Sequence, residues 1–105
     1  MQDRLLSFLG IAQKAGKVVS GGEQCENAIR SGQAKLVVLA LDAKKNTSEM
    51  IQNKCGYYGV ALIRYGTKDA LGRAIGKGER ACAAVTDEGF GFNIKKLYDS
   101  GKKEE

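Results

Sequence analysis

The stretch "LVVLAL" at positions 36–41 is a continuous apolar run with β-branched valines at its centre. A run without polar alternation is typical of a strand that is buried on both faces of a sheet. We therefore expect residues 36–41 to form the central strand of a sheet that has helices on both sides.

The segments on either side of this run alternate between short apolar stretches and helical periodicity. Strands are predicted at 17–20, 60–65 and 81–86, and helices at 3–14, 22–31 and 67–76. Thr67 is expected to cap the helix that it opens, because a threonine hydroxyl accepts a bond from a first-turn N–H. This alternation predicts an α/β domain with helices on both faces of one sheet.

Two further helices are expected from weaker signals. In "NTSEMIQNKC" (46–55), Asn46 followed by Glu49 resembles a capping arrangement, so Asn46 is expected to start a helix. Ile94, Leu97 and Tyr98 indicate a short final helix. Residues 1–100 are therefore predicted to form a single domain, followed by a charged, flexible tail at 101–105.

The composition argues against several kinds of active site. The chain has no histidine, and Cys25, Cys55 and Cys82 are too far apart for a zinc motif or a disulfide framework. "GKGERA" (76–81) fits a dinucleotide-binding pattern, but it follows a helix and precedes a strand, whereas the true motif does the reverse. We expect buried thiols, no catalytic residue, no metal and no cofactor.

The charge is informative about partners. The net charge is +5, and the surplus lies in residues 32–80, which hold nine basic and four acidic residues. A basic surplus attracts phosphates, so nucleic acid is a natural partner. No apolar run approaches a membrane span, and the N-terminus lacks a signal-peptide pattern, so we expect a cytoplasmic protein that does not enter membranes.

"GFGF" (89–92) matches four central letters of the aromatic strand motif of RNA recognition motifs. The flanking letters do not fit, since Glu88 replaces the leading base and Asn93 replaces a valine. The segment also follows the last predicted strand. It is therefore expected to be a glycine turn whose phenylalanines pack against the final helix.

Two longer stretches, "GKVVSGGEQCENAIRSGQAKLVVLALDAKKN" and "LGRAIGKGERACAAV", closely resemble the L7Ae-type ribosomal protein family, which includes L30e. The resemblance covers roughly residues 4–86 and is strongest to compact bacterial, YlxQ-like members. It implies a three-layer α/β/α sandwich around a mixed four-stranded sheet. It also implies binding of kink-turn RNA by three segments at one edge of the sheet.

The first implied segment is a helix start, where the family reads G-x-N-E-x-x-K, or G-x-K-Q-x-x-K in bacteria. Gly21 and Gln24 match this pattern, whereas Glu23 and Asn27 stand where Asn or Lys is usual. The other two segments are the loop after the central strand and the loop into the last strand. The implied RNA contacts are Gly21, Gly22, Glu23, Gln24, Asn27, Asp42, Lys44, Lys45, Gly78, Glu79, Arg80 and Ala81.

Physical chemistry supports this placement independently. A helix N-terminus presents unpaired N–H groups and a partial positive charge, and glycines there allow an RNA backbone to approach. Gln24 can read a purine edge, and Lys44 and Lys45 can hold phosphates. The sequence therefore predicts non-catalytic binding of structured RNA by a ribosomal or ribosome-associated protein that is monomeric without RNA.

Two other classes remain open. One is an adaptor subunit that binds proteins and whose RNA site has decayed through Glu23 and Asn27. The other is a small-molecule enzyme of a related α/β fold, which would need a deep apolar pocket with convergent polar groups.

Overall fold

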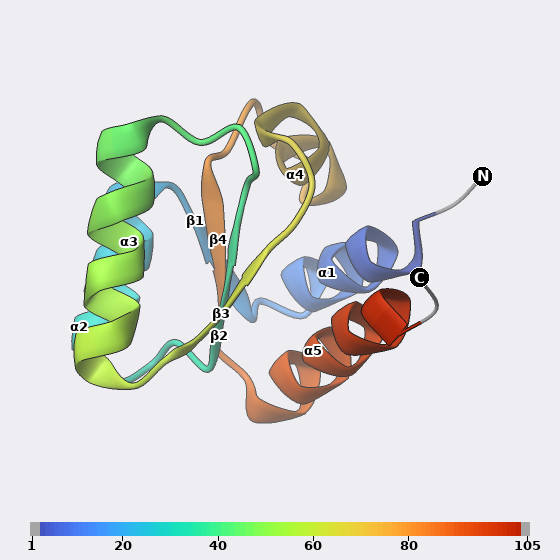
Figure 1. Ribbon diagram of the computed structural model, residues 1–105. Coiled ribbons are helices and arrows are strands. Elements are labelled where there is room, and N and C mark those ends of the chain that lie inside the picture. Colours follow the sequence, from blue (N-terminus) through green and yellow to red (C-terminus); the bar gives the residue numbers. More distant parts are fainter. Residues whose placement is uncertain (1–2, 104–105) are drawn as a thin grey trace.

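The computed structural model describes residues 3–103, in which one layer of strands lies between two layers of helices (Figure 1). The strands are β1 (Val18–Ser20), β2 (Leu36–Leu39), β3 (Ala61–Arg64) and β4 (Cys82–Val85). The helices are α1 (Arg4–Lys14), α2 (Gly22–Arg30), α3 (Lys45–Tyr58), α4 (Lys68–Ala74) and α5 (Glu88–Lys103). The predicted alternation and the three-layer α/β/α sandwich are confirmed.

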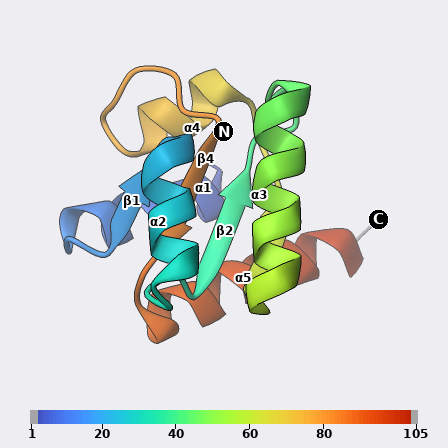
Figure 2. The same cartoon turned by 90° about the vertical axis from the view of Figure 1, so that its left-hand side faces the viewer.

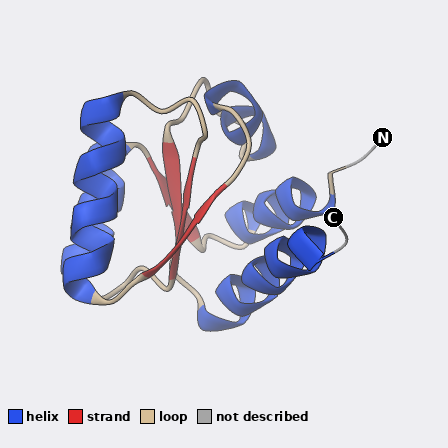
Figure 3. Ribbon diagram, viewed as in Figure 1, coloured by secondary structure: helices blue, strands red, loops and turns tan. Residues whose placement is uncertain are grey.

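The four strands form one mixed sheet between the two helical layers (Figure 3). Their order in the sheet is β1-β4-β2-β3. β3 is parallel to β2, with Leu36 opposite Ala61, whereas β4 is antiparallel to both β1 and β2. β1, β2 and β3 therefore run in the same direction, and their carboxyl ends lie at one end of the sheet. β4 begins at that same end.

β2 is buried on both faces, as the apolar run predicted. Leu36 and Val38 belong to one core, which also contains Leu9 of α1 and Leu71 of α4. Its alternate residues Val37 and Leu39 belong to a second core beneath α2 and α3. This division follows from the period of two in a strand, which sends successive side chains to opposite faces.

Different helices cover the two faces of the sheet, and both sets pack on small residues of β4. α2 and α3 lie side by side over one face, and α1, α4 and α5 cover the other (Figures 1 and 2). In β4, Ala83 and Ala84 are fully buried, one in each core. Their small side chains leave room for helices to pack close to the sheet on both sides.

The start of α3 differs from the prediction. The helix begins at Lys45 after the extended residue Lys44, and no side chain caps it, so Asn46 lies inside the first turn. The carbonyl of Lys44 already accepts the first helical bond, from Ser48 N at 2.8 Å. The preceding loop is tied to another helix, and this tertiary constraint overrides the local capping preference.

The final helix is much longer than predicted, and "GFGF" is part of it rather than a turn. The Asp87 carboxylate accepts a hydrogen bond from Phe90 N at 2.9 Å and so caps the helix start. Gly91 is buried, and a methyl group there would lie 3.5 Å from Leu36 Cβ. Because Gly91 has no side chain, α5 can cross close to β2 at this point. The ring of Phe90 packs against that of Phe8 in a tilted arrangement, with centroids 5.4 Å apart, whereas Phe92 faces solvent.

Other differences are small. β2 ends two residues earlier than the apolar run, so Ala40 and Leu41 belong to the following loop. Residues 101–103 of the predicted flexible tail continue α5, and residues 104–105 lie outside the described part of the chain. Among residues 3–103, no helix has the length and hydropathy to cross a membrane.

Candidate nucleic-acid interface

Three predicted RNA-contacting segments meet at one end of the sheet, the upper end in Figure 1. Gly21 N donates to Cys82 O at 3.0 Å, which joins the end of β1 to the start of β4. Ala40 N donates to Ala81 O at 2.8 Å, which joins the end of β2 to the same strand. These two bonds thus bring together segments that lie far apart in the sequence.

We call this end the helix-start surface. It comprises residues 21–24, 27, 41–45 and 78–81, and it contains all twelve predicted contacts together with Leu41 and Ala43.

The first segment is a glycine-fronted helix start. Gly21 precedes α2 with φ +93°, a conformation that L side chains rarely adopt, and no side chain caps the helix. Glu23 and Gln24 are exposed, whereas Cys25 is fully buried. The first-turn N–H groups of α2 are therefore open to a ligand.

The start of α3 lies directly beside that of α2 (Figure 2). A methyl group at Gly22 would be 3.9 Å from Thr47 Cγ2 and from Met50 Cε, both in α3. The two helices run the same way because β1 and β2 are parallel in direction. Their positive dipole ends therefore add at one place, where Lys44 and Lys45 are exposed and make no ion pair with any described residue.

The loop after β2 is held rigidly. Leu41 N donates to Gly66 O at 2.8 Å, and Arg64 Nη2 donates to Leu41 O at 3.4 Å. The Asp42 carboxylate accepts from Lys68 N at 2.8 Å and so helps to cap α4, which Thr67 caps as predicted by accepting from Ala70 N. Asp42 thus has a structural role at the base of this surface.

The third segment packs against α4, because a methyl group at Gly72 would collide with the backbone carbonyl of Gly78. Gly78 and Glu79 are exposed, and Arg80 folds back over the loop. Arg80 Nη1 donates to Glu79 O at 2.9 Å, and its Nε donates to Ser20 Oγ at 3.1 Å. The arginine thus connects the loop to the end of β1 and places a cation between two of the three segments.

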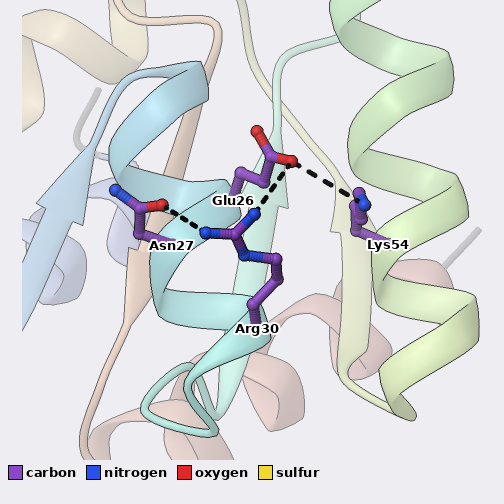
Figure 4. A network of polar contacts seen from close by, with 4 residues as sticks. All are labelled: Glu26, Asn27, Arg30 and Lys54. Carbon is purple, nitrogen blue, oxygen red and sulfur yellow. Dashed lines mark hydrogen bonds and ion pairs between the residues drawn. The ribbon is translucent and has the colours of Figure 1, made fainter.

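Asn27 lies one turn further along α2, in a polar network (Figure 4). Its side-chain oxygen accepts from Arg30 Nη2 at 3.3 Å. Arg30 and Lys54 both lie near the Glu26 carboxylate, at 4.0 and 3.8 Å. Position 27 lacks the usual lysine, but the guanidinium of Arg30 provides positive charge beside it.

Sequence reasoning missed Leu41 at this surface. Its side chain is 62% exposed although its backbone is tightly bonded. It lies in the loop after β2, next to the predicted contact Asp42. The sequence did contain a signal for this exposed leucine, because the apolar run at 36–41 extends two residues beyond the end of β2.

The cysteines are buried and free, as predicted. Burial raises the pKa of the Cys55 thiol to about 11. A hydrogen bond with Cys82, together with burial, raises the pKa of Cys25 well above its ordinary value. These two thiols are therefore protonated at neutral pH and are poor nucleophiles. Among residues 3–103, no group of three or more His, Cys, Asp or Glu side chains has the arrangement to hold a metal ion.

Comparison with known proteins decides the family. The profile of the "Ribosomal protein L7Ae/L30e/S12e/Gadd45 family" matches residues 3–94. The chain belongs to this family. The resemblance seen in the sequence is thereby confirmed, including its bacterial character, as the relatives below show.

Two relatives illustrate this family, one named as a bacterial RNA-binding protein and one as a ribosomal protein. The RNA-binding protein YlxQ of Bacillus subtilis is 44% identical over 92 residues, which cover 88% of this chain and 92% of YlxQ. The ribosomal protein eL30 of Spodoptera frugiperda is 35% identical over 100 residues, covering 90% and 85% of the two chains.

Solved structures agree with this fold. A Bacillus halodurans protein of unknown function superposes with a TM-score of 0.90 at 39% identity, covering 93% of this chain and 99% of that one. The Giardia lamblia 15.5kD RNA binding protein superposes with a TM-score of 0.75 at 21% identity, over 95% and 89% of the chains. The second likeness concerns the fold alone.

Proposed function

We propose that this protein binds structured RNA of the kink-turn type at the helix-start surface, without catalysing a reaction. The observation that carries the proposal is the meeting of three separate segments around two adjacent helix starts. This arrangement offers N–H groups, helix dipoles and the cations Lys44 and Lys45 to phosphates. The names of the bacterial and ribosomal relatives support RNA as the ligand.

Gln24 is the proposed base-reading residue. It is exposed in the first turn of α2, beside the buried Cys25, so its amide points away from the core. An amide can donate and accept on a purine edge. A regular RNA duplex hides its base edges in a deep, narrow groove, whereas a kinked RNA exposes them. The proposed preference for kinked RNA follows from this difference.

The protein is further proposed to act in the cytoplasm, as a monomer when free of RNA, within a ribosomal or ribosome-associated particle. The adaptor role remains the second candidate, and the acidic Glu23 at the helix start is the observation that favours it. A carboxylate there repels phosphates, and removing the repulsion by Glu23→Lys is expected to tighten RNA binding several-fold if this surface meets RNA.

The test is a titration of wild type and Gln24→Ala against one kink-turn RNA and one straight duplex. Gln24→Ala is expected to cost about 1–3 kcal/mol on the kink-turn and much less on the duplex. Gln33→Ala removes the same exposed amide at the other end of α2 and serves as the matched control. Equal affinity for both RNAs, unchanged by Gln24→Ala, would favour the adaptor role.

A further inference from the structure

The end of the sheet opposite the helix-start surface carries exposed aromatic side chains. Phe92 of α5 is 68% exposed, and Tyr57 and Tyr58 at the end of α3 are 83% and 43% exposed. They account for three of the five large hydrophobic side chains that are exposed among the described residues. Aromatic rings gathered at one end, outside any core, indicate a binding surface.

Two shallow hollows lie beside these rings. The first, of about 400 Å³, lies between the ends of α2 and α3, with Tyr58, Arg30 and Lys35 in its lining. The second, of about 300 Å³, lies against α5, with Phe92, Lys95 and again Lys35 in its lining. Lys35 therefore stands between two hollows, each of which has one aromatic ring.

Cations outnumber acids around these hollows. The distal surface comprises residues that line these hollows, together with Lys96 of a neighbouring hollow beside Phe92. Its members are Arg30, Lys35, Tyr58, Phe92, Lys95 and Lys96. Lys95 pairs with Asp99 at 2.8 Å, and Glu88 lines the hollow beside Phe92. Lys35 Nζ donates to the carbonyl of Gly32 at 3.3 Å and makes no ion pair with any described residue. Positive charge therefore remains available near both rings.

We propose that the distal surface binds unpaired nucleotides of single-stranded RNA. Bases stack on Tyr58 and Phe92, and the phosphates that link them lie over Lys35 and Lys96. Aromatic platforms combined with cations are the usual means of binding single strands without reading sequence.

The helix dipoles decide where the phosphates lie. α2 and α3 end at this surface, and their terminal carbonyls disfavour anions. The phosphates are therefore held on the side of α5, between Lys35 in the hollow beside Phe92 and the exposed Lys96. An acidic protein partner would meet the same carbonyls with its carboxylates, but it would gain less from two separate rings than stacked bases do.

This site is independent of the helix-start surface, because the two lie at opposite ends of the strands. It needs no kink in the RNA. One small protein can thus hold a folded RNA element at one end and a flanking unpaired strand at the other.

The experiment titrates a labelled single-stranded octauridylate and a kink-turn RNA into wild type and into the double variant Tyr58→Ala/Phe92→Ala. The double variant is expected to bind the octamer at least about tenfold more weakly, whereas its affinity for the kink-turn stays within about twofold of wild type. Ile11→Ala, which shortens an exposed side chain on α1, is the matched control and is expected to change neither affinity. Thermal melting checks that the double variant is folded, as expected for exposed positions.

Two results would overturn the proposal. One is octamer binding that the double variant leaves unchanged. The other is octamer binding that is lost in Lys44→Ala/Lys45→Ala instead, because the strand would then lie on the helix-start surface. The titration of Gln24→Ala with the kink-turn RNA tests the helix-start surface separately. Single-strand binding at the distal surface and kink-turn binding at the helix-start surface can therefore be refuted independently of each other.

Discussion

The two ends of this sheet use different chemistry, and the strand directions explain why. At the helix-start surface, β1 and β2 lead into α2 and α3, so two positive dipole ends lie together with Gly21, Lys44 and Lys45. At the distal surface the same helices end, and exposed rings replace open N–H groups. Parallel βα connections thus give one end suited to phosphates and another that needs aromatic stacking to bind the same polymer.

The largest expected effect is a loss of stability on substitution of Gly72, because this glycine leaves room for the loop at 78–81 to pack on α4. A methyl group at Gly72 would collide with the backbone carbonyl of Gly78 and come within 2.7 Å of its carbonyl carbon. Gly72→Ala should therefore cost about 3 kcal/mol of unfolding free energy and displace the loop at 78–81. Thermal melting measures the loss.

Gly56→Ala is the matched control for that substitution. Gly56 lies in α3, and a methyl group there would meet nothing within 4 Å. This variant should gain about 0.5–1 kcal/mol, because alanine favours helix. Equal melting temperatures for the two variants would show that the loop is not packed on α4 as described.

The next effect concerns charge. Lys44→Ala with Lys45→Ala should weaken kink-turn binding by about 2 kcal/mol near 0.1 M salt and reduce the log–log salt slope by about two units. The ranking of RNAs should be largely unchanged, because phosphate contacts carry no sequence information. Binding measured across a salt series tests this.

Lys14→Ala with Lys17→Ala removes the same charge far from the helix-start surface and should leave the slope unchanged. A slope that falls equally in both double variants would mean that net charge alone attracts the RNA.

Leu41 gives a smaller effect on binding. If RNA covers this exposed leucine, Leu41→Ala should weaken binding by about 1 kcal/mol, since roughly half of its apolar surface would be removed. Stability should change by less than about 0.5 kcal/mol. Kink-turn titration together with thermal melting separates the two quantities, and binding identical to wild type would exclude Leu41 from the interface.

The smallest effect concerns Tyr65, which ties β3 to α1. Its hydroxyl donates to the Asp3 carboxylate at 2.6 Å. Burial, this hydrogen bond and the charge of Asp3 raise the pKa of Tyr65 to about 12. The stabilisation is therefore complete below pH about 10 and is lost as the pH rises from about 10 to 12.

Tyr65→Phe should cost up to about 1 kcal/mol at neutral pH. The difference between wild type and variant should shrink across the alkaline range, as urea unfolding at several pH values would show. A difference that stays constant at every pH would mean that folding does not raise the pKa of Tyr65.

Local signals explain which parts of the fold could be predicted. The alternation of strands and helices, the double-sided burial of β2 and the Thr67 cap all depend on neighbouring residues. The predicted Asn46 cap failed because the contact between Asp42 and α4 fixes that loop from a distance. The "GFGF" turn failed because Asp87 caps a helix in which Gly91 fits against β2.

The candidate site was placed by family resemblance and by helix-start chemistry. What the residues alone could not give was the meeting of Gly21, Ala40 and Ala81, because it depends on β4 lying between β1 and β2. Leu41 was missed for a similar reason. Its exposure is set by where the strand ends, and an apolar run does not show that.

The central claim is that one RNA contacts all three segments of the helix-start surface together. The most direct measurement is a titration of isotope-labelled protein with a kink-turn RNA, followed by the amide NMR signals. We expect signals from residues 21–24, 41–45 and 78–81 to shift along one binding curve, while those of Lys35 and Phe92 stay in place. Shifts confined to the distal surface, or spread evenly over all lysines, would contradict it.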